Sequence, residues 1–94
     1  MAKVYFPTHG VDVAASAPHP ANTHYRVSRG VEHWEGGIET HKVIKVQMVY
    51  DGTVSGRRSP SFPVGSDDAK RVMKAIEEVE KGGGKTLRGE ASSG

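Results

Sequence analysis

Residues 40–81 constrain the fold more than any other stretch, because they carry several strong local signals in succession. In residues 40–50 apolar and polar side chains alternate, with Ile44, Val46, Met48 and Tyr50 on the face that we expect to be buried. Asp51-Gly52 follows at once, and this dipeptide is a strong signal for a tight β-hairpin turn. A second extended run begins at Thr53. The pattern predicts two antiparallel strands joined by a short turn.

The register of this hairpin decides where Arg57 points. A strict two-residue loop would pair Tyr50 with Thr53 and Met48 with Ser55, which places Ser55 and Arg57 on the buried side of the sheet. Burial of a charged side chain without a partner is unfavourable. We therefore expect a bulge centred on a glycine, which would change the register.

A helix is predicted after the hairpin, over residues 66–81. Ser66 is a good N-cap residue, and Asp67 and Asp68 in the first turn complement the positive end of the helix dipole. The glycines at 82–84 end the pattern. The side chains expected to form a single apolar stripe are Ala69, Val72, Met73, Ile76 and Val79.

The N-terminal part gives weaker signals. Residues 24–35 alternate as in a strand with Tyr25, Val27, Val31 and His33 on its buried face, and Gly30 could place a bulge in it. The β-prone run at residues 4–6 is stopped by Pro7 and is at best an edge strand. Residues 8–23 are rich in Gly, Ala, Ser and Pro and are expected to form a flexible loop.

These patterns predict an α+β fold, a three- or four-stranded antiparallel β-meander packed on one C-terminal α-helix. The 94 residues suffice for one domain with a modest core. We divide the chain into a short edge strand and flexible loop (1–22), a core domain of sheet and helix (23–81) and a disordered tail (82–94).

Composition excludes several classes of function. The absence of cysteine rules out disulfides, thiolate catalysis and cysteine-based zinc sites. No apolar run is long enough to span a membrane, and the first residues lack a signal-peptide core, so a cytoplasmic location is expected. The net charge of +2 is mildly basic and compatible with nucleic-acid contact.

Each candidate catalytic or metal-binding motif lacks a residue, an order of elements or a spacing that its function requires. Gly84-Lys85-Thr86 resembles the end of a phosphate-binding loop, but the position that requires glycine holds Val79, and the order of strand and helix is reversed. The five histidines lack metal-binding spacing, and no catalytic triad pattern is present. We expect no enzyme activity, catalytic residue, metal, cofactor or small-molecule substrate.

The most unusual local cluster is Arg57-Arg58-Ser59-Pro60, in which two guanidiniums are suited to phosphate oxygens. It also fits a solvated loop, and it resembles a phosphorylation site that follows basic residues. Cations and one aromatic on the predicted sheet could join it in binding single-stranded DNA or RNA. The candidate nucleic-acid-binding residues are Arg26, Trp34, Lys42, Lys45, Arg57 and Arg58.

A second function remains open. The domain could be a protein-interaction or assembly module without affinity for nucleic acid, for example a homodimer. Such a module would use an exposed edge strand, or Val43 and Val49, which interrupt the alternation of residues 40–50.

The order of features from residues 42–46, through Gly56-Arg57-Arg58 and Phe62-Pro63-Val64, to the helix at 68–80 resembles the PC4-like (transcriptional coactivator p15) single-stranded DNA-binding domains. The resemblance covers the second half of the chain. It implies a curved antiparallel sheet followed by a helix, a dimer, and a sheet that binds single strands with basic and aromatic groups. The positions that it carries over are Lys42, Lys45, Arg57 and Arg58.

Overall fold

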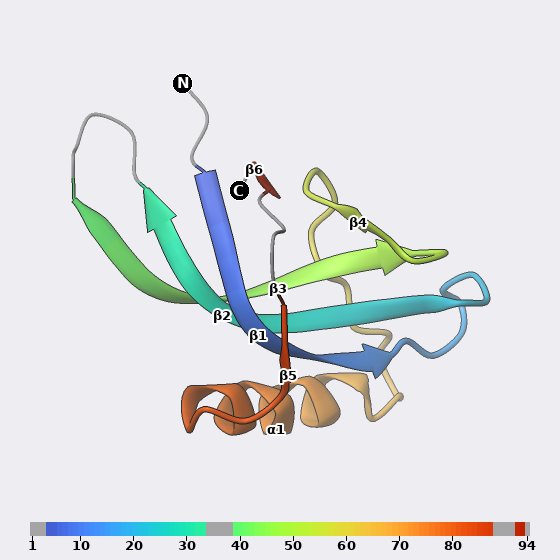
Figure 1. Ribbon diagram of the computed structural model, residues 1–94. Helices are drawn as coiled ribbons and strands as arrows, with labels where there is room; N and C mark the ends of the chain where they lie inside the picture. The colour runs from blue at the N-terminus through green and yellow to red at the C-terminus, as the bar shows by residue number, and fades with distance from the viewer. Residues whose placement is uncertain (1–3, 34–38, 88–91, 94) are drawn as a thin grey trace.

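The computed structural model describes residues 4–33, 39–87 and 92–93, which form one antiparallel sheet and one helix. The strands are β1 (Val4–Ala14), β2 (Thr23–His33), β3 (Thr40–Tyr50), β4 (Thr53–Ser55), β5 (Lys85–Thr86) and β6 (Ser92–Ser93), and the helix is α1 (Asp68–Glu80). The strands lie in the order β4-β3-β2-β1-β5, and β6 also pairs with β1 (Figure 1). The predicted α+β meander with one C-terminal helix is confirmed.

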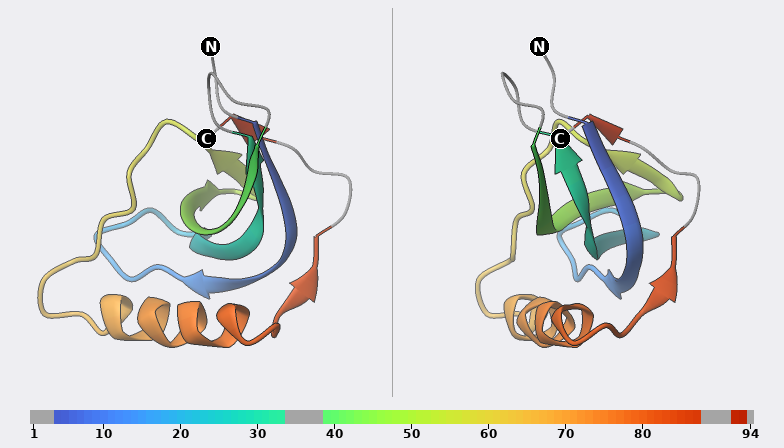
Figure 2. Two further views of the ribbon diagram at one scale, coloured as in Figure 1. Left: turned by 90° about the vertical axis from the view of Figure 1, so that its left-hand side faces the viewer. Right: turned by 60° about the vertical axis from the view of Figure 1, so that its left-hand side comes forward.

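The three long strands bend along their length, so that the sheet curls and the helix lies against the outer side of the curl (Figure 2). This arrangement gives the sheet two different faces. The outer face of β2 carries Tyr25 and Val27, which pack on α1 with Met48 of β3. The predicted apolar face of β3 is confirmed, since Ile44, Val46 and Tyr50 pack around the same core.

The helix presents a somewhat different stripe from the one predicted. Val72, Ala75 and Val79 are buried, whereas Ala69 is exposed and Met73 is 64% exposed. Asp68 is also buried, at the first turn. Because Asp68, Val72, Ala75 and Val79 share one side of a 3.6-residue helix, the burial of Asp68 rotates the contact face away from Met73.

The hairpin is formed by a strict two-residue loop, so the predicted bulge is wrong. Tyr50 pairs with Thr53 and Met48 with Ser55, and Asp51 and Gly52 have φ angles of 49° and 83°. These positive values are those of the tight turn that Asp-Gly favours. The expected burial of Arg57 does not arise because β4 ends at Ser55, and the chain leaves the sheet before Arg57.

The N-terminal segment is a full strand, which corrects the division into a short strand and a flexible loop. β1 continues past Pro7, which keeps its place opposite Gly30, and the register shifts between Pro7 and His9, so that Thr8 is the extra residue of a bulge. The bulge lies in β1, opposite Gly30, and not in β2. At Gly30 the strands approach closely, since an added Cβ would lie 2.3 Å from the Phe6 carbonyl oxygen.

The tail is also partly ordered, contrary to prediction. β5 and β6 pair with β1, and the Leu87 amide donates to the Thr8 carbonyl at 2.8 Å. Gly84 has a φ of 98°, and a Cβ there would lie 2.7 Å from the Gly10 carbonyl oxygen. Glycine therefore lets the chain return closely against β1.

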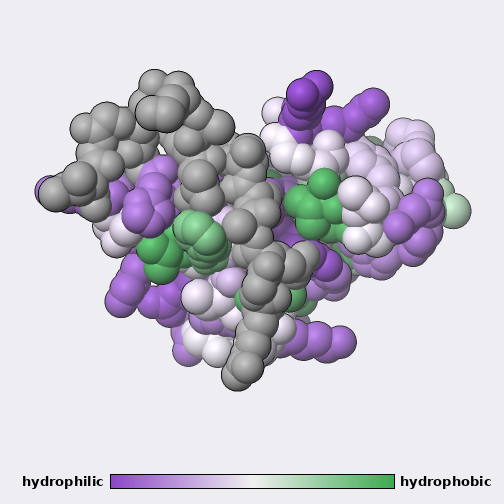
Figure 3. Space-filling view, turned by 45° about the horizontal axis from the view of Figure 1, so that its top comes forward, coloured by the Kyte–Doolittle hydropathy of each residue, from purple (hydrophilic) through white to green (hydrophobic). Residues whose placement is uncertain are grey.

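The inner face of the curl buries polar side chains. Ser28 is fully buried and Glu32 is 4% exposed, whereas His33, which was predicted to be buried, is exposed. Bending brings the side chains of the inner face together, so they are covered without a second helix. Seen with the top of the molecule tilted forward, most of the coloured surface is hydrophilic and the apolar residues form separate patches (Figure 3).

Candidate nucleic-acid interface

The predicted cations do not share one surface. Lys42 lies on the same face of β3 as Ile44, and its side chain is exposed there. Lys45 lies on the opposite face, on the inner side of the curl, because successive residues of a strand alternate. The structure therefore separates Lys42 from the other candidates. Trp34 lies outside the described residues.

Two of the predicted cations are engaged by carboxylates. The Arg26 guanidinium donates to Asp12 through Nε at 2.9 Å and Nη2 at 3.2 Å. Lys45 forms an ion pair with the buried Glu32 and lies over the Tyr5 ring, with Nζ 5.1 Å from the ring centroid. Because their charge is already balanced, Arg26 and Lys45 are weaker anion ligands than the sequence alone suggested.

Arg57 and Arg58 differ from these two in being exposed, and no ion pair is found for either within the described part of the chain. They belong to residues 56–60, the segment that follows β4. The Arg58 guanidinium lies over the Tyr50 ring, with Cζ 5.7 Å from the centroid. A cation above an aromatic face is held by the quadrupole of the ring. Arg58 is thus positioned while its charge remains accessible.

Two surface depressions meet at Arg58, and we call them together the Arg58 groove. One, of about 440 Å³, adjoins the β1–β2 loop and is lined by Pro18, His19, Pro20, Tyr50, Arg58, Ser59 and Ser61. The other, of about 330 Å³, adjoins β3 and is lined by Lys45, Val46, Gln47, Ser55, Gly56, Arg57, Arg58, Ser59 and Pro60. Lys45 and Arg57 line the same depression. The sequence did not show whether these two side chains would lie together, because that depended on the register of the hairpin.

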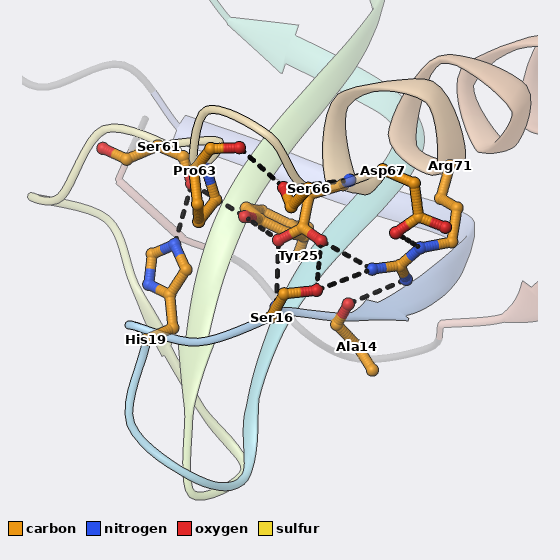
Figure 4. Close-up of polar contacts among 10 residues, drawn as sticks. Ala14, Ser16, His19, Tyr25, Ser61, Pro63, Ser66, Asp67 and Arg71 are labelled. Atoms are coloured by element: carbon orange, nitrogen blue, oxygen red, sulfur yellow. Dashed lines mark hydrogen bonds and ion pairs between the residues drawn. The ribbon is translucent and has the colours of Figure 1, made fainter.

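A hydrogen-bonded anchor fixes the far end of the arginine segment. The Ser61 carbonyl accepts from the Tyr25 hydroxyl at 2.7 Å and from His19 Nε2 at 2.8 Å (Figure 4). The His19 and Phe62 rings also pack against the Tyr25 ring, with centroid distances of 5.7 Å and 5.0 Å. The segment is thereby tied to β2 and to the β1–β2 loop.

Tyr25 also belongs to a buried polar cluster centred on Asp68, whose partners Ser16, Tyr25 and Arg71 are labelled in Figure 4. The Asp68 carboxylate accepts from the Ser16 amide at 2.9 Å and Arg71 Nη2 at 2.7 Å, and also from the Ser16 hydroxyl. The Tyr25 hydroxyl lies 2.8 Å from it and shares its single proton between Asp68 and the Ser61 carbonyl. Burial alone would raise the pKa of Asp68, but the bonds from Ser16 and Tyr25 and the charge of Arg71 outweigh it and lower the pKa. Burial, followed by the bond to Asp68, raises the pKa of Tyr25. This cluster joins the start of α1 to the groove.

The sequence identified the arginines of the groove but missed its aromatic and ring-bearing partners. Tyr50 was assigned to the core, and His19 to a flexible loop. The only local signal was the rigid Pro18-His19-Pro20 sequence. Nothing in the sequence shows that the β1–β2 loop and the segment after β4 meet, because that contact depends on the curl of the whole sheet.

Metal-binding clusters, membrane-spanning helices and similarity to known proteins also bear on the class of protein. Within residues 4–33, 39–87 and 92–93, no three acidic or histidine side chains gather in a way that could hold a metal ion. In the same residues no helix is both long and apolar enough to cross a membrane. Comparison of the chain with protein-family models, curated proteins and solved structures gave no match. The geometry of the groove is therefore the feature that bears on function.

Proposed function

We propose that this domain binds single-stranded nucleic acid along the Arg58 groove, largely independently of sequence. The observation that carries the proposal is the guanidinium of Arg58 held above the Tyr50 ring at the meeting point of two depressions. Aromatic rings beside cations are the combination that stacks bases and neutralises a sugar-phosphate backbone. Single strands are favoured because only unstacked bases can offer their faces to protein rings.

The groove offers different groups to the two parts of a nucleotide strand. The exposed guanidinium of Arg57 can donate forked hydrogen bonds to a phosphate, and Arg58 can do so without leaving the Tyr50 ring. The Tyr50 and His19 rings and the flanking prolines give flat surfaces for bases or sugars. Because both arginines can bind phosphates, which every sequence presents, backbone charge should dominate the affinity.

The test is oligonucleotide binding by the double variant Arg57→Ala/Arg58→Ala, measured by fluorescence anisotropy over a range of salt concentrations. We expect the wild-type affinity to fall steeply with salt, and the variant to lose about tenfold or more at low salt, with a log-log salt slope smaller by about one to two. Removing two phosphate-binding charges accounts for both effects.

The matched control is Lys70→Ala/Lys74→Ala, which removes two exposed cations from α1, away from the groove. It should leave most of the affinity in place. Equal losses in the two double variants would show that net charge alone attracts the oligonucleotide. Wild-type protein that binds no oligonucleotide at low salt would refute the proposal.

A second candidate function is assembly through β3, and the free edge of this strand favours it. β4 pairs only with Met48, Val49 and Tyr50, so residues 40–47 have no strand on that side in the described structure. Val49, the other residue predicted to contact a second copy, is 2% exposed and therefore cannot form such a contact. Val43 is half-buried. A strand edge that has no neighbouring strand is a template for another strand.

A second copy of β3 could pair antiparallel with the first about a two-fold axis at Ile44. In that register Lys42 would oppose Val46 and Lys45 would oppose Val43, so that no two lysines face each other directly. This pairing would extend the curled sheet across two chains. Lys45, Val46 and Gln47 also line the Arg58 groove, so this pairing and nucleic-acid binding would compete for the same part of β3.

A further inference from the structure

Residues 56–60 are held differently from the rest of the groove. The chain is fixed before them by the pairing of β4 and after them by the Ser61 carbonyl, which accepts two hydrogen bonds. Between these points, no hydrogen bond is found for any of the five residues within the described structure. The segment is thus a tethered loop whose backbone is free to be drawn into another protein's active site.

Ser59 is the hydroxyl-bearing residue of this loop. Its side chain is exposed, and it lines both depressions of the Arg58 groove, next in sequence to the two arginines that lack acidic partners in the described structure. Of the neighbouring serines, Ser61 is also exposed, but the two hydrogen bonds that its carbonyl accepts hold its backbone in place. Ser55 and Ser66 are less available. Ser55 lies in β4, and the Ser66 hydroxyl donates to the Pro63 carbonyl at 2.7 Å.

We propose that Ser59 is a phosphorylation site, and that phosphorylation closes the Arg58 groove to nucleic acid. The enzyme would be a serine/threonine kinase that recognises arginine before the acceptor residue. In the reaction the Ser59 hydroxyl oxygen attacks the γ-phosphorus of ATP. A new O–P bond forms, the bond between the γ-phosphorus and its bridging oxygen breaks, ADP leaves, and the hydroxyl proton passes to the base of the kinase.

The consequence for the groove follows from charge, and this part depends on the proposed function. Phosphoserine carries a charge of about −1.5 to −2 at neutral pH and offers three acceptor oxygens. Placed beside Arg57 and Arg58, it would take up the donors that are proposed to bind backbone phosphates. It would also repel an incoming strand. The phosphate on Ser59 would therefore compete with the backbone phosphates of the nucleic acid for Arg57 and Arg58.

The experiment treats the full chain with ATP and a purified kinase of this specificity, and locates the phosphate by mass spectrometry, with Ser59→Ala as the control for the site. We expect one phosphate on Ser59 and oligonucleotide affinity lower by about tenfold or more at moderate salt. Ser59→Asp should lower the affinity in the same direction. Thr86→Asp, which adds the same charge to exposed β5 at the other edge of the sheet, should not.

Phosphorus NMR separates the two proposals. If the arginines hold the phosphate, its titration midpoint should lie lower in the wild-type protein than in Arg57→Ala/Arg58→Ala, whether or not any oligonucleotide binds. Because the variant lacks the arginines that the kinase recognises, phosphoserine is incorporated at position 59 of both proteins during synthesis for this comparison. Protein that binds no oligonucleotide when unmodified would refute the proposed function alone. The inference itself is overturned if no phosphate is found on Ser59, if the titration midpoints are equal, or if the modified protein binds a single strand as tightly as before.

Discussion

At the scale of single residues, Asp68 shows how position changes the role of a side chain. The sequence places it in the first turn of the helix, where its charge complements the dipole. In the structure it is fully buried and accepts hydrogen bonds from Ser16, Tyr25 and Arg71. It therefore ties the helix to the β1–β2 loop and, through Tyr25, to the Ser61 anchor of the groove.

We expect Asp68→Asn to lower the free energy of unfolding by about 2 kcal/mol or more at neutral pH, because donors that the carboxylate satisfied are left without a charged acceptor. The pKa of Asp68 is lowered in the folded state, so the unfolded chain binds the proton more readily. The stabilisation is complete above about pH 4 and is lost progressively as the pH falls below it.

Urea unfolding at a series of pH values between neutral and strongly acidic checks this prediction. The matched control is Asp67→Asn, which changes the neighbouring exposed carboxylate that also contacts Arg71. The wild-type protein and Asp67→Asn should lose stability more steeply in acid than Asp68→Asn does. Identical slopes in all three proteins would contradict the assigned role of Asp68.

The sequence pattern predicted the arginines of the Arg58 groove but not the rings that lie beside them. Arg57 and Arg58 stand out because charge and turn chemistry are local properties of the sequence. Lys42 and Lys45 were grouped although the alternation of a strand places them on opposite faces, and Lys45 is engaged by Glu32. That ion pair depends on β2 and β3 lying side by side in a particular register. His19 and Tyr50 were missed for a similar reason, since they meet only in three dimensions.

At the scale of elements, the hairpin and the helix were predictable and β1 was not. Hydrophobic alternation and the Asp51-Gly52 turn are short-range signals, and they gave β3, β4 and α1 close to their observed bounds. β1 contains Pro7 and several small residues, which locally oppose a strand. It forms because β2 offers Gly30 opposite Pro7, where the two backbones approach closely, and the register then shifts at Thr8.

This close approach leads to a prediction about two glycines. Gly30→Ala should lower the free energy of unfolding by about 2 kcal/mol or more, because its Cβ would press on the Phe6 carbonyl and the Pro7 backbone. Gly52→Ala should cost about 1 kcal/mol, because that site is open and only its positive φ is strained.

Thermal or urea unfolding of the two alanine variants measures the difference, and each variant serves as the control for the other. The larger loss at Gly30 would identify backbone contact between β1 and β2 as the stabilising feature. A larger loss at Gly52 would show instead that the hairpin turn dominates and that β1 can move away from β2 without penalty.

At the scale of the whole molecule, the two edges of the sheet differ. One edge of β1 is covered by β5 and β6, whereas β3 is open over residues 40–47 in the described structure. Lys42 and Lys45 are the kind of residues that discourage unwanted pairing of an open edge. The two-fold register about Ile44 is one arrangement in which they would not prevent it.

If two copies pair in this register, sedimentation equilibrium should show a mass that rises from one chain to two with concentration. Val43→Lys should shift this equilibrium towards the single chain, because the new lysine would face Lys45 of the second copy. Thr53→Lys adds the same charge to an exposed position on β4 and should leave the equilibrium unchanged. A single-chain mass at every concentration would exclude assembly through β3.

The pairing of β5 and β6 with β1 also has a consequence for the path of folding. β1 receives one neighbour from β2, which follows it closely, but the other from the last part of the chain. Contacts between residues that are far apart in sequence require closure of a long loop and slow the folding of small domains. On the ribosome, the outer edge of β1 would stay unpaired until residues 85–93 had emerged.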